Sequence, residues 1–326
     1  MFEPAHDWYI PEGFIENTEN DEYLLYADTD SAYLLYDLPF NKFENIIQLV
    51  EYIQGIAKEL GKIYNESLEY YLCGNIGLDP KYNTMDFKSE VIAHRGFFNT
   101  KKFYSLGVVW DEGTFFELEW YLKITGGQIK KSDITQLTKM LLTEVYNLIV
   151  LDKNVSDLVY MYRYIFVTLK NKYKLQIKQD IDNMDFYSFS VPKKWGSTKK
   201  TTPPFVTGAK LYNAIMSDTF RPGDSFMVVK IKINYYKLLD YFEERNDIVD
   251  DDKFSLQLKE VVTLGNKINV LSIPPLMEQE ERDQLLNIMT ELGIVLDYDD
   301  IILSNIDMKL ETFDKLFDDS IRQAVL

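Results

Sequence analysis

Residues 22–38, EYLLYADTDSAYLLYDL, constrain the fold more strongly than any other stretch of the chain. Two apolar runs with the same letters, YLLY, flank a short polar insert, ADTDSA. Apolar and aromatic runs on either side of turn-forming residues predict two antiparallel strands joined as a β-hairpin. The hairpin would carry Asp28 and Asp30 at its tip, where two carboxylates about 5 Å apart repel by roughly 3 kcal/mol at an effective dielectric of 20.

Two interpretations of this tip are open on the residues alone. Asp, Thr and Ser side chains bond the neighbouring backbone readily, so DTDS can be turn chemistry and nothing more. A divalent cation would also offset the repulsion, because Mg²⁺ takes oxygen ligands, typically one or two carboxylates together with substrate phosphates.

The rest of the N-terminal part predicts one long helix followed by strands. From residue 41 to about residue 72, apolar residues recur at spacings of three and four, which is typical of an amphipathic helix. Residues 82–127 alternate between strand-like runs and turns, and Asp111-Glu112-Gly113 is a hairpin-turn signal. Gly126-Gly127 ends this block, so we predict two domains, residues 1–126 and 127–326.

The second domain is predicted to be mostly helical. Ser132 is a good N-cap for a helix with apolar residues from Ile134 to Leu148, and a second helix is expected over 154–173. A basic loop, 192–204, precedes a short helix, GAKLYNAIM, and SFMVVKIKIN (225–234) alternates like a strand. The acidic tail is predicted to be mostly helical. The whole chain therefore belongs to the α+β class.

The charge distribution allows a nucleic-acid partner despite a net charge of −17. Residues 1–80 carry three Lys or Arg against sixteen Asp or Glu, and residues 235–326 carry nine against twenty-one. Residues 168–210, in contrast, carry nine Lys against three Asp. Because salt screens charges beyond about 8 Å, a local basic stripe can bind phosphates on an acidic protein.

Other features exclude several classes of protein. With one cysteine, Cys73, the chain can form no intrachain disulfide, and one cysteine with two histidines argues against a Cys/His zinc site. No uncharged apolar run reaches membrane length, and MFEPAHDWY lacks the basic and apolar regions of a signal peptide. We expect a soluble, cytoplasmic protein without a membrane partner.

Four segments resemble family B DNA polymerases. Residues 26–31, YADTDS, resemble the family's Y-G-D-T-D-S motif, and residues 101–104, KKFY, resemble its K-K-R-Y element. LKITGGQIKKSD (122–133) is similar to the segment that joins palm to thumb, and TPPFVTGAKLYNAI (202–215) is similar to the thumb of the large tailed-phage replicative enzymes. The four segments occur in the family's order and span most of residues 22–235.

The resemblance implies a DNA-directed DNA polymerase of the α+β class. Residues 1–126 would be the C-terminal part of the palm, an antiparallel sheet with a catalytic hairpin and packed helices, and residues 127–326 a mostly helical thumb with an acidic tail. Asp30 would bridge two Mg²⁺ ions, with Asp28 as a supporting carboxylate and Thr29 at the same site. Primer–template DNA and deoxynucleoside triphosphates would be the ligands. The residues expected to grip DNA are Lys101, Lys102, Tyr104, Lys123, Lys130, Lys131, Lys193, Lys194, Lys199, Lys200 and Lys210.

The sequence departs from the family pattern in several places. Ala27 replaces the usual glycine, and Phe103 replaces an arginine. The family's other catalytic aspartate, in D-x-x-S-L-Y-P, and its nucleotide-binding K-x-x-x-N-S-x-Y-G are not found in these 326 residues. The expectation is one subunit of a split polymerase, in the host cytoplasm if phage-encoded, whose N-terminal polymerase chain supplies the second carboxylate and shares the Mg²⁺ ions. The alternative is a DNA-gripping module without catalysis; an acidic interaction protein fits the lysine stripe poorly.

Two smaller features each allow two interpretations. The tail KLETFDKLFDDSIRQAVL (309–326) could dock on a sliding clamp through Phe313, Leu316 and Phe317, as the resemblance implies. The spacing of Leu310, Phe313, Phe317 and Ile321 instead favours an ordinary amphipathic helix. Trp195 could pack on a sugar or anchor its own loop.

Overall fold

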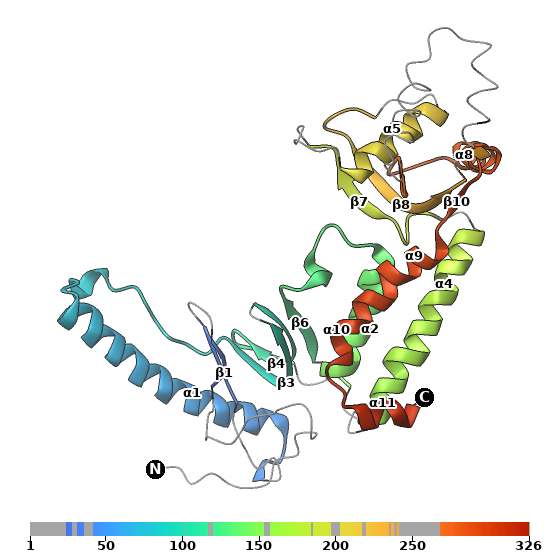
Figure 1. The fold of residues 1–326 in the computed structure, drawn as a ribbon. Helices are drawn as coiled ribbons and strands as arrows, with labels where there is room; N and C mark the ends of the chain where they lie inside the picture. Colours follow the sequence, from blue (N-terminus) through green and yellow to red (C-terminus); the bar gives the residue numbers. More distant parts are fainter. Residues whose placement is uncertain are drawn as a thin grey trace. The chain divides into compact units, whose positions relative to one another are not determined.

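The structure is a computed structural model of the chain (Figure 1). It describes residues 24–27, 31–35, 42–100, 102–116, 120–152, 157–183, 185–196, 203–216, 220–234, 236–237, 240 and 268–325. Over these residues the fold mixes helices with sheets, and each strand pairing is antiparallel, which agrees with the α+β class. None of the helices in these ranges combines the length and apolar character needed to cross a membrane.

The chain divides into two compact units. The first unit contains residues 1–127 and 145–161, and the second contains residues 128–144 and 162–326. Residues 145–161, which the sequence assigns to the second domain, therefore group with the N-terminal part.

The predicted hairpin is present in the first unit. Strand β1 (Leu24–Ala27) pairs with β2 (Ala32–Leu34), and the register places Ala27 opposite Ala32. The predicted helix is α1 (Ile46–Glu69), which continues as the π-helical turn η2 (Tyr70–Asn75). The Asn45 side chain caps α1 by accepting the backbone N–H of Gln48 at 3.0 Å. A short 3₁₀ turn, η3 (Pro80–Tyr82), follows.

In the first unit, the described strands that follow α1 form a four-stranded antiparallel sheet. They are β3 (Val91–Thr100), β4 (Phe103–Asp111), β5 (Thr114–Phe115) and β6 (Tyr121–Thr125). Glu112 and Gly113, both with positive φ, connect β4 to β5, which confirms the predicted turn. Val50 of α1 packs with Ile92 and Val109 of the sheet, together with partly buried aromatic side chains, to form an apolar core.

The last part of helix α2 (Gln136–Val150) packs on the same sheet within the first unit. A Cβ atom on Gly107 would lie 2.3 Å from the Val150 carbonyl oxygen, so the backbones are in close contact here. The Arg95 guanidinium donates to the carbonyl oxygens of Ile149 at 3.2 Å and Asp152 at 2.9 Å. Arg95 therefore satisfies carbonyls at the C-terminal end of α2, where intrahelical partners run out.

The start of α2 differs from the prediction. The helix begins at Gln136, and the Thr135 hydroxyl accepts the Thr138 backbone N–H at 3.0 Å. Ser132 is therefore not the N-cap, because the capping contact is made three residues later, where Thr135 is buried. The next helix is longer than predicted and runs through α3 (Leu158–Arg163), η5 (Tyr164–Leu169) and α4 (Lys170–Asp182).

The second unit is less helical than predicted. Its described strands form a four-stranded antiparallel sheet in which β8 pairs with the three others. The strands are β7 (Val191–Lys194), β8 (Ser225–Ile233), β9 (Val270–Ile273) and β10 (Ile294–Leu296). Helix α5 (Pro204–Met216) lies against β9, where a Cβ on Gly208 would be 2.8 Å from the Val270 carbonyl oxygen.

The acidic tail packs into the second unit, as Figure 1 shows in red. It contains α8 (Gln279–Glu291), α9 (Tyr298–Ile302), η6 (Leu303–Asp307), α10 (Met308–Asp314) and α11 (Asp319–Val325). Phe313 and Phe317 are buried, and the Phe317 ring contacts Tyr162 and Phe166 edge-on. This burial fits the amphipathic-helix interpretation rather than a clamp-docking peptide. The single predicted helix is split because the Asp318 side chain caps a new one at Ile321.

Candidate nucleic-acid interface

The DTDS segment connects the two strands of the hairpin. Asp28, Thr29 and Asp30 lie outside the described residues. The flanking register, with Ala27 opposite Ala32, leaves residues 28–31 as the connection. Their side chains supply carboxylate and hydroxyl oxygens, and this donor chemistry fits Mg²⁺. Within the described ranges, no group of three or more His, Cys, Asp or Glu could hold a metal ion.

An aromatic cluster joins the hairpin to the sheet of the first unit. The Tyr33 hydroxyl of β2 donates to the Tyr104 hydroxyl of β4 at 2.7 Å. The Tyr33 ring lies 5.0 Å from the Tyr104 ring and 5.5 Å from the Phe98 ring, and these last two stack on each other. The hairpin that carries DTDS and the strand that carries Tyr104, a predicted DNA-binding residue, therefore meet directly although 71 residues separate Tyr33 from Tyr104.

A double-mutant cycle can measure this contact. Tyr33→Phe and Tyr104→Phe each keep the ring but remove a hydroxyl, so they break the hydrogen bond and leave most of the packing in place. We expect a coupling free energy of about 1 kcal/mol, the usual net value of one hydrogen bond. Urea unfolding of the two single variants and the double variant measures it. Strict additivity would show that the hairpin does not dock on β4.

The turn before Tyr104 is shaped by a glycine pair at the end of β6. Lys102 has a φ of 61°, and the pairing of Thr100 with Phe103 leaves residues 101 and 102 as the turn. A Cβ on Gly126 would lie 2.0 Å from the Lys102 carbonyl oxygen, and one on Gly127 would lie 2.2 Å from the Phe103 ring. The glycines thus let β6 end directly against the KKFY turn. Lys101 lies outside the described residues.

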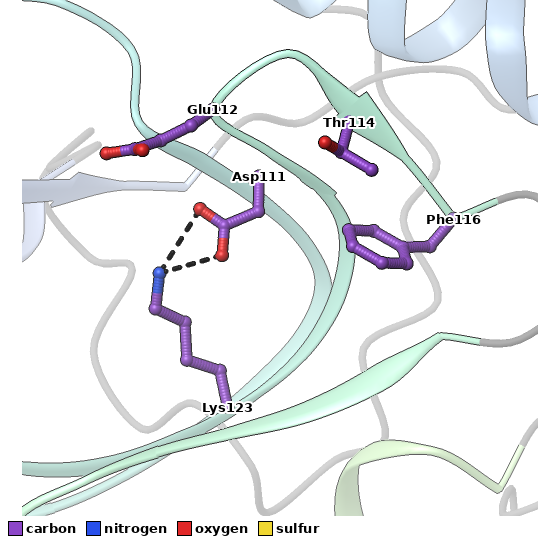
Figure 2. A pocket seen from close by; sticks show the side chains of 5 residues that line it. All are labelled: Asp111, Glu112, Thr114, Phe116 and Lys123. Atoms are coloured by element: carbon purple, nitrogen blue, oxygen red, sulfur yellow. Dashed lines mark hydrogen bonds and ion pairs between the residues drawn. The ribbon is translucent and has the colours of Figure 1, made fainter.

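Lys123, unlike Lys102, does not lie in the turn between β3 and β4 but on strand β6. Its ammonium group contacts the Asp111 carboxylate at 3.0 Å, as Figure 2 shows, and the Tyr121 hydroxyl donates to the same carboxylate. The hydrogen bond from Tyr121, followed by those from Lys123, lowers the pKa of Asp111. Burial and then the bond to Asp111 raise the pKa of Tyr121 to about 12. The Lys123 ammonium group is therefore already paired with the Asp111 carboxylate of the same sheet.

A surface pocket of about 480 Å³ surrounds this ion pair. Asp111, Glu112 and Lys123 line it together with Thr114 and Phe116, and Figure 2 shows their side chains. The pocket is built at the β4–β5 turn, and it combines two carboxylates with one ammonium group. This balance of charge makes it a poor match for the phosphate of a nucleic acid.

The second unit carries the remaining predicted lysines. Lys130 and Lys131 are exposed beside the 3₁₀ turn η4 (Gln128–Lys130). Lys193 and Lys194 lie on β7, and Lys210 is exposed on α5. The Lys193 ammonium group lies 3.0 Å from Asp133. Lys199 and Lys200 lie outside the described residues, and the Trp195 backbone extends the β7–β8 pairing through hydrogen bonds with Asp224 and Gly223.

The sequence analysis did not include Lys309 among the predicted DNA-binding residues. Lys309 of α10 is half-buried, and its pKa is lowered first by burial and then by the charge of Lys131, against a smaller opposing effect of Asp133. It sits in the acidic tail, where the sequence DMKLE has no feature of a DNA-binding segment. Lys131 and Lys309 are far apart in the sequence, so the effect of one charge on the other arises only in the folded unit.

The fold and these contacts define a mixed α/β chain with antiparallel sheets. In its first unit, a hairpin with a carboxylate-containing turn docks through Tyr33 onto a sheet whose neighbouring turn carries Lys102. The chain matches no family model, and no curated protein sequence matches it.

Proposed function

We propose that the chain is the C-terminal part of a family B DNA polymerase, with the end of the palm in its first unit and a duplex-binding thumb in its second. The observation that supports this most strongly is the Tyr33–Tyr104 hydrogen bond, with the Gly126–Lys102 contact beside it. Tyr33 lies just after segment 26–31, Tyr104 and Lys102 belong to segment 101–104, and Gly126 belongs to segment 122–133. Segments that serve one reaction must meet in this way.

In this proposal the carboxylates of Asp28 and Asp30 hold Mg²⁺ near the primer 3′ end. Two such ions stabilise the attacking and leaving oxygens of nucleotidyl transfer when they are bound. Asp30 would hold these ions, with Asp28 as a supporting carboxylate. Lys102 and Tyr104, whose turn lies beside the hairpin, orient the primer terminus. Lysines contact phosphates rather than bases, which suits an enzyme that must copy any sequence.

One bridging carboxylate does not complete such a site, because Mg²⁺ requires near-octahedral oxygen coordination. The second carboxylate and the nucleotide-binding helix would come from polypeptide that is not among these 326 residues. In this proposal, exposed apolar side chains of the first unit contribute to the contact with that polypeptide. Tyr70 is 74% exposed, Tyr82 is 66% exposed and Met85 is 62% exposed, on and after the end of α1.

Duplex binding tests the thumb. If about five lysines of the second unit contact phosphates, the logarithm of affinity should fall against the logarithm of salt concentration with a slope of about −4 to −5. Fluorescence anisotropy of a labelled primer–template duplex, titrated with the full chain at several salt concentrations, measures this slope. Two duplexes of unrelated sequence should bind equally. A flat salt response, or no binding at about 50 mM salt, would contradict a role for these lysines.

A further inference from the structure

The pocket at the β4–β5 turn has one more negative than positive charge among the residues that line it, as Figure 2 shows. The Lys123 ammonium group lies 3.0 Å from one oxygen of Asp111 and 3.3 Å from the other, so it balances that carboxylate. Within the ranges that the structure describes, no lysine, arginine or histidine forms an ion pair with Glu112. The excess negative charge of the pocket is therefore the Glu112 carboxylate.

The backbone of the turn sets the position of Glu112. Asp111 pairs with Thr114, so Glu112 and Gly113 are the two turn residues, and their φ angles are 43° and 93°. Positive φ at both positions is typical of a two-residue hairpin turn. The Glu112 backbone N–H also donates to the Glu90 carbonyl oxygen at 2.9 Å, just before the start of β3. Because Glu112 is exposed, the turn presents its carboxylate to solvent at the pocket.

An aromatic side chain lines the same pocket. The Phe116 ring contacts the Tyr121 ring edge-on, with 4.7 Å between the ring centroids, and the Tyr121 hydroxyl donates to Asp111. The Phe116 backbone N–H donates to the Val109 carbonyl oxygen at 2.8 Å, so both the backbone and the ring of Phe116 are held. An arginine guanidinium matches this combination, because it is planar, carries one positive charge, stacks on aromatic rings and donates to carboxylate oxygens.

Other ligand classes match the pocket less well. A Mg²⁺ or Ca²⁺ ion needs about six or more oxygen ligands, and the Lys123 ammonium group would repel it. A phosphate would meet a net negative charge. Sites for free small molecules enclose most of their ligand, whereas Glu112 and Thr114 are exposed. An arginine that belongs to another polypeptide needs no such enclosure, because the surrounding contact holds it in place.

We propose that this pocket binds an arginine side chain of another polypeptide, with Glu112 as the carboxylate that pairs with the guanidinium and Phe116 as the ring on which it stacks. Lys123 competes with the guanidinium for the carboxylates and so weakens the contact. The charge of the first unit favours a basic partner, because residues 1–80 carry three Lys or Arg against sixteen Asp or Glu. The proposal does not depend on a role in DNA synthesis.

The test titrates the full chain with N-acetyl-L-arginine amide, whose ends are uncharged as they are within a polypeptide. NMR follows the backbone amide signals of residues 112–116, where we expect saturable shifts with a Kd of about 1–10 mM, the range of one small side chain. N-acetyl-L-citrulline amide has a similar shape without the charge and should bind about tenfold more weakly. N-acetyl-L-lysine amide has the charge without the planar group and should bind about threefold more weakly. Free L-arginine should bind no more tightly than its capped form.

Variants of the pocket should change this affinity in opposite directions. Glu112→Gln should weaken binding of the arginine amide about fivefold, the size of one exposed ion pair. Lys123→Gln should strengthen it about fivefold, because the competing charge is removed and Asp111 becomes a second acceptor. A loss of folding cannot produce that increase. Glu66→Gln removes an exposed carboxylate of α1 outside the pocket, so this matched control should leave the Kd unchanged.

Three results would overturn the proposal. No shift at residues 112–116 with about 50 mM arginine amide would show that the pocket does not bind a guanidinium. Equal binding of the citrulline or lysine amide would show that the guanidinium itself is not recognised. Tighter binding of free L-arginine would indicate a site for the amino acid rather than for a polypeptide. Because the test uses neither duplex DNA nor primer extension, its failure leaves the proposed function standing, and the reverse also holds.

Discussion

Replacing Asp30 with Asn is expected to slow primer extension by about a thousandfold or more. This corresponds to a loss of about 4 kcal/mol of transition-state stabilisation, since each 1.36 kcal/mol is tenfold in rate. The substitution keeps the shape of the side chain and removes only the charge that Mg²⁺ requires. The assay is single-turnover extension by this chain combined with the polypeptide that supplies the second carboxylate, with Mg²⁺ and deoxynucleoside triphosphates. Neither polypeptide alone should extend the primer.

Two other aspartates serve as matched controls. Asp28→Asn should reduce the rate less than Asp30→Asn, because Asp28 is the supporting carboxylate in the proposal. Asp37→Asn, just beyond the second apolar run, should extend normally. Duplex binding should be unchanged in all three variants. Near-normal extension with Asn at position 30 would mean that DTDS is turn chemistry alone, and the chain would then be a DNA-gripping module without catalysis.

Replacing Gly126 with Ala is expected to lower the free energy of unfolding of the first unit by about 3 kcal/mol. Gly126 has a φ of 67°, where an L side chain costs about 1–2 kcal/mol. The added Cβ would also lie 2.0 Å from the Lys102 carbonyl oxygen, which is backbone and cannot rotate away. The KKFY turn must therefore move. Urea unfolding followed by tryptophan fluorescence measures the loss, and primer extension should also slow.

Two other glycines distinguish the conformational cost of a positive φ from the clash of the added Cβ atom. Gly113 has a φ of 93° and open space around its Cβ position, so Gly113→Ala should show only the conformational cost of about 1–2 kcal/mol. Gly55 lies within α1 with nothing near its Cβ position, so Gly55→Ala should stabilise the unit by about 0.5–1 kcal/mol. A Gly126→Ala variant no less stable than Gly113→Ala would show that β6 does not pack on the turn.

Part of the candidate site was predictable because its signals are local. The turn at Glu112-Gly113 and the hairpin around residues 28–31 depend on residues that are neighbours in the chain. The partner of Lys123 was not predictable. Asp111 lies on the adjacent strand β4, five residues beyond Leu106, which pairs with Lys123, so no local pattern in the sequence shows that its carboxylate reaches that ammonium group.

The sequence by itself determined the elements whose apolar spacing extends over many residues, namely α1 and β8, together with the turns that join the short strands. Tertiary structure decided the rest. Strand β9 has four residues, too few for a periodic pattern, and it is stable only because it pairs with β8 and lies under α5. The buried Asn305 satisfies its amide oxygen with the hydroxyls of Thr135 and Thr138, about 170 residues earlier in the chain. Contacts of this range follow from burial and hydrogen bonding in the folded unit, and no local pattern encodes them.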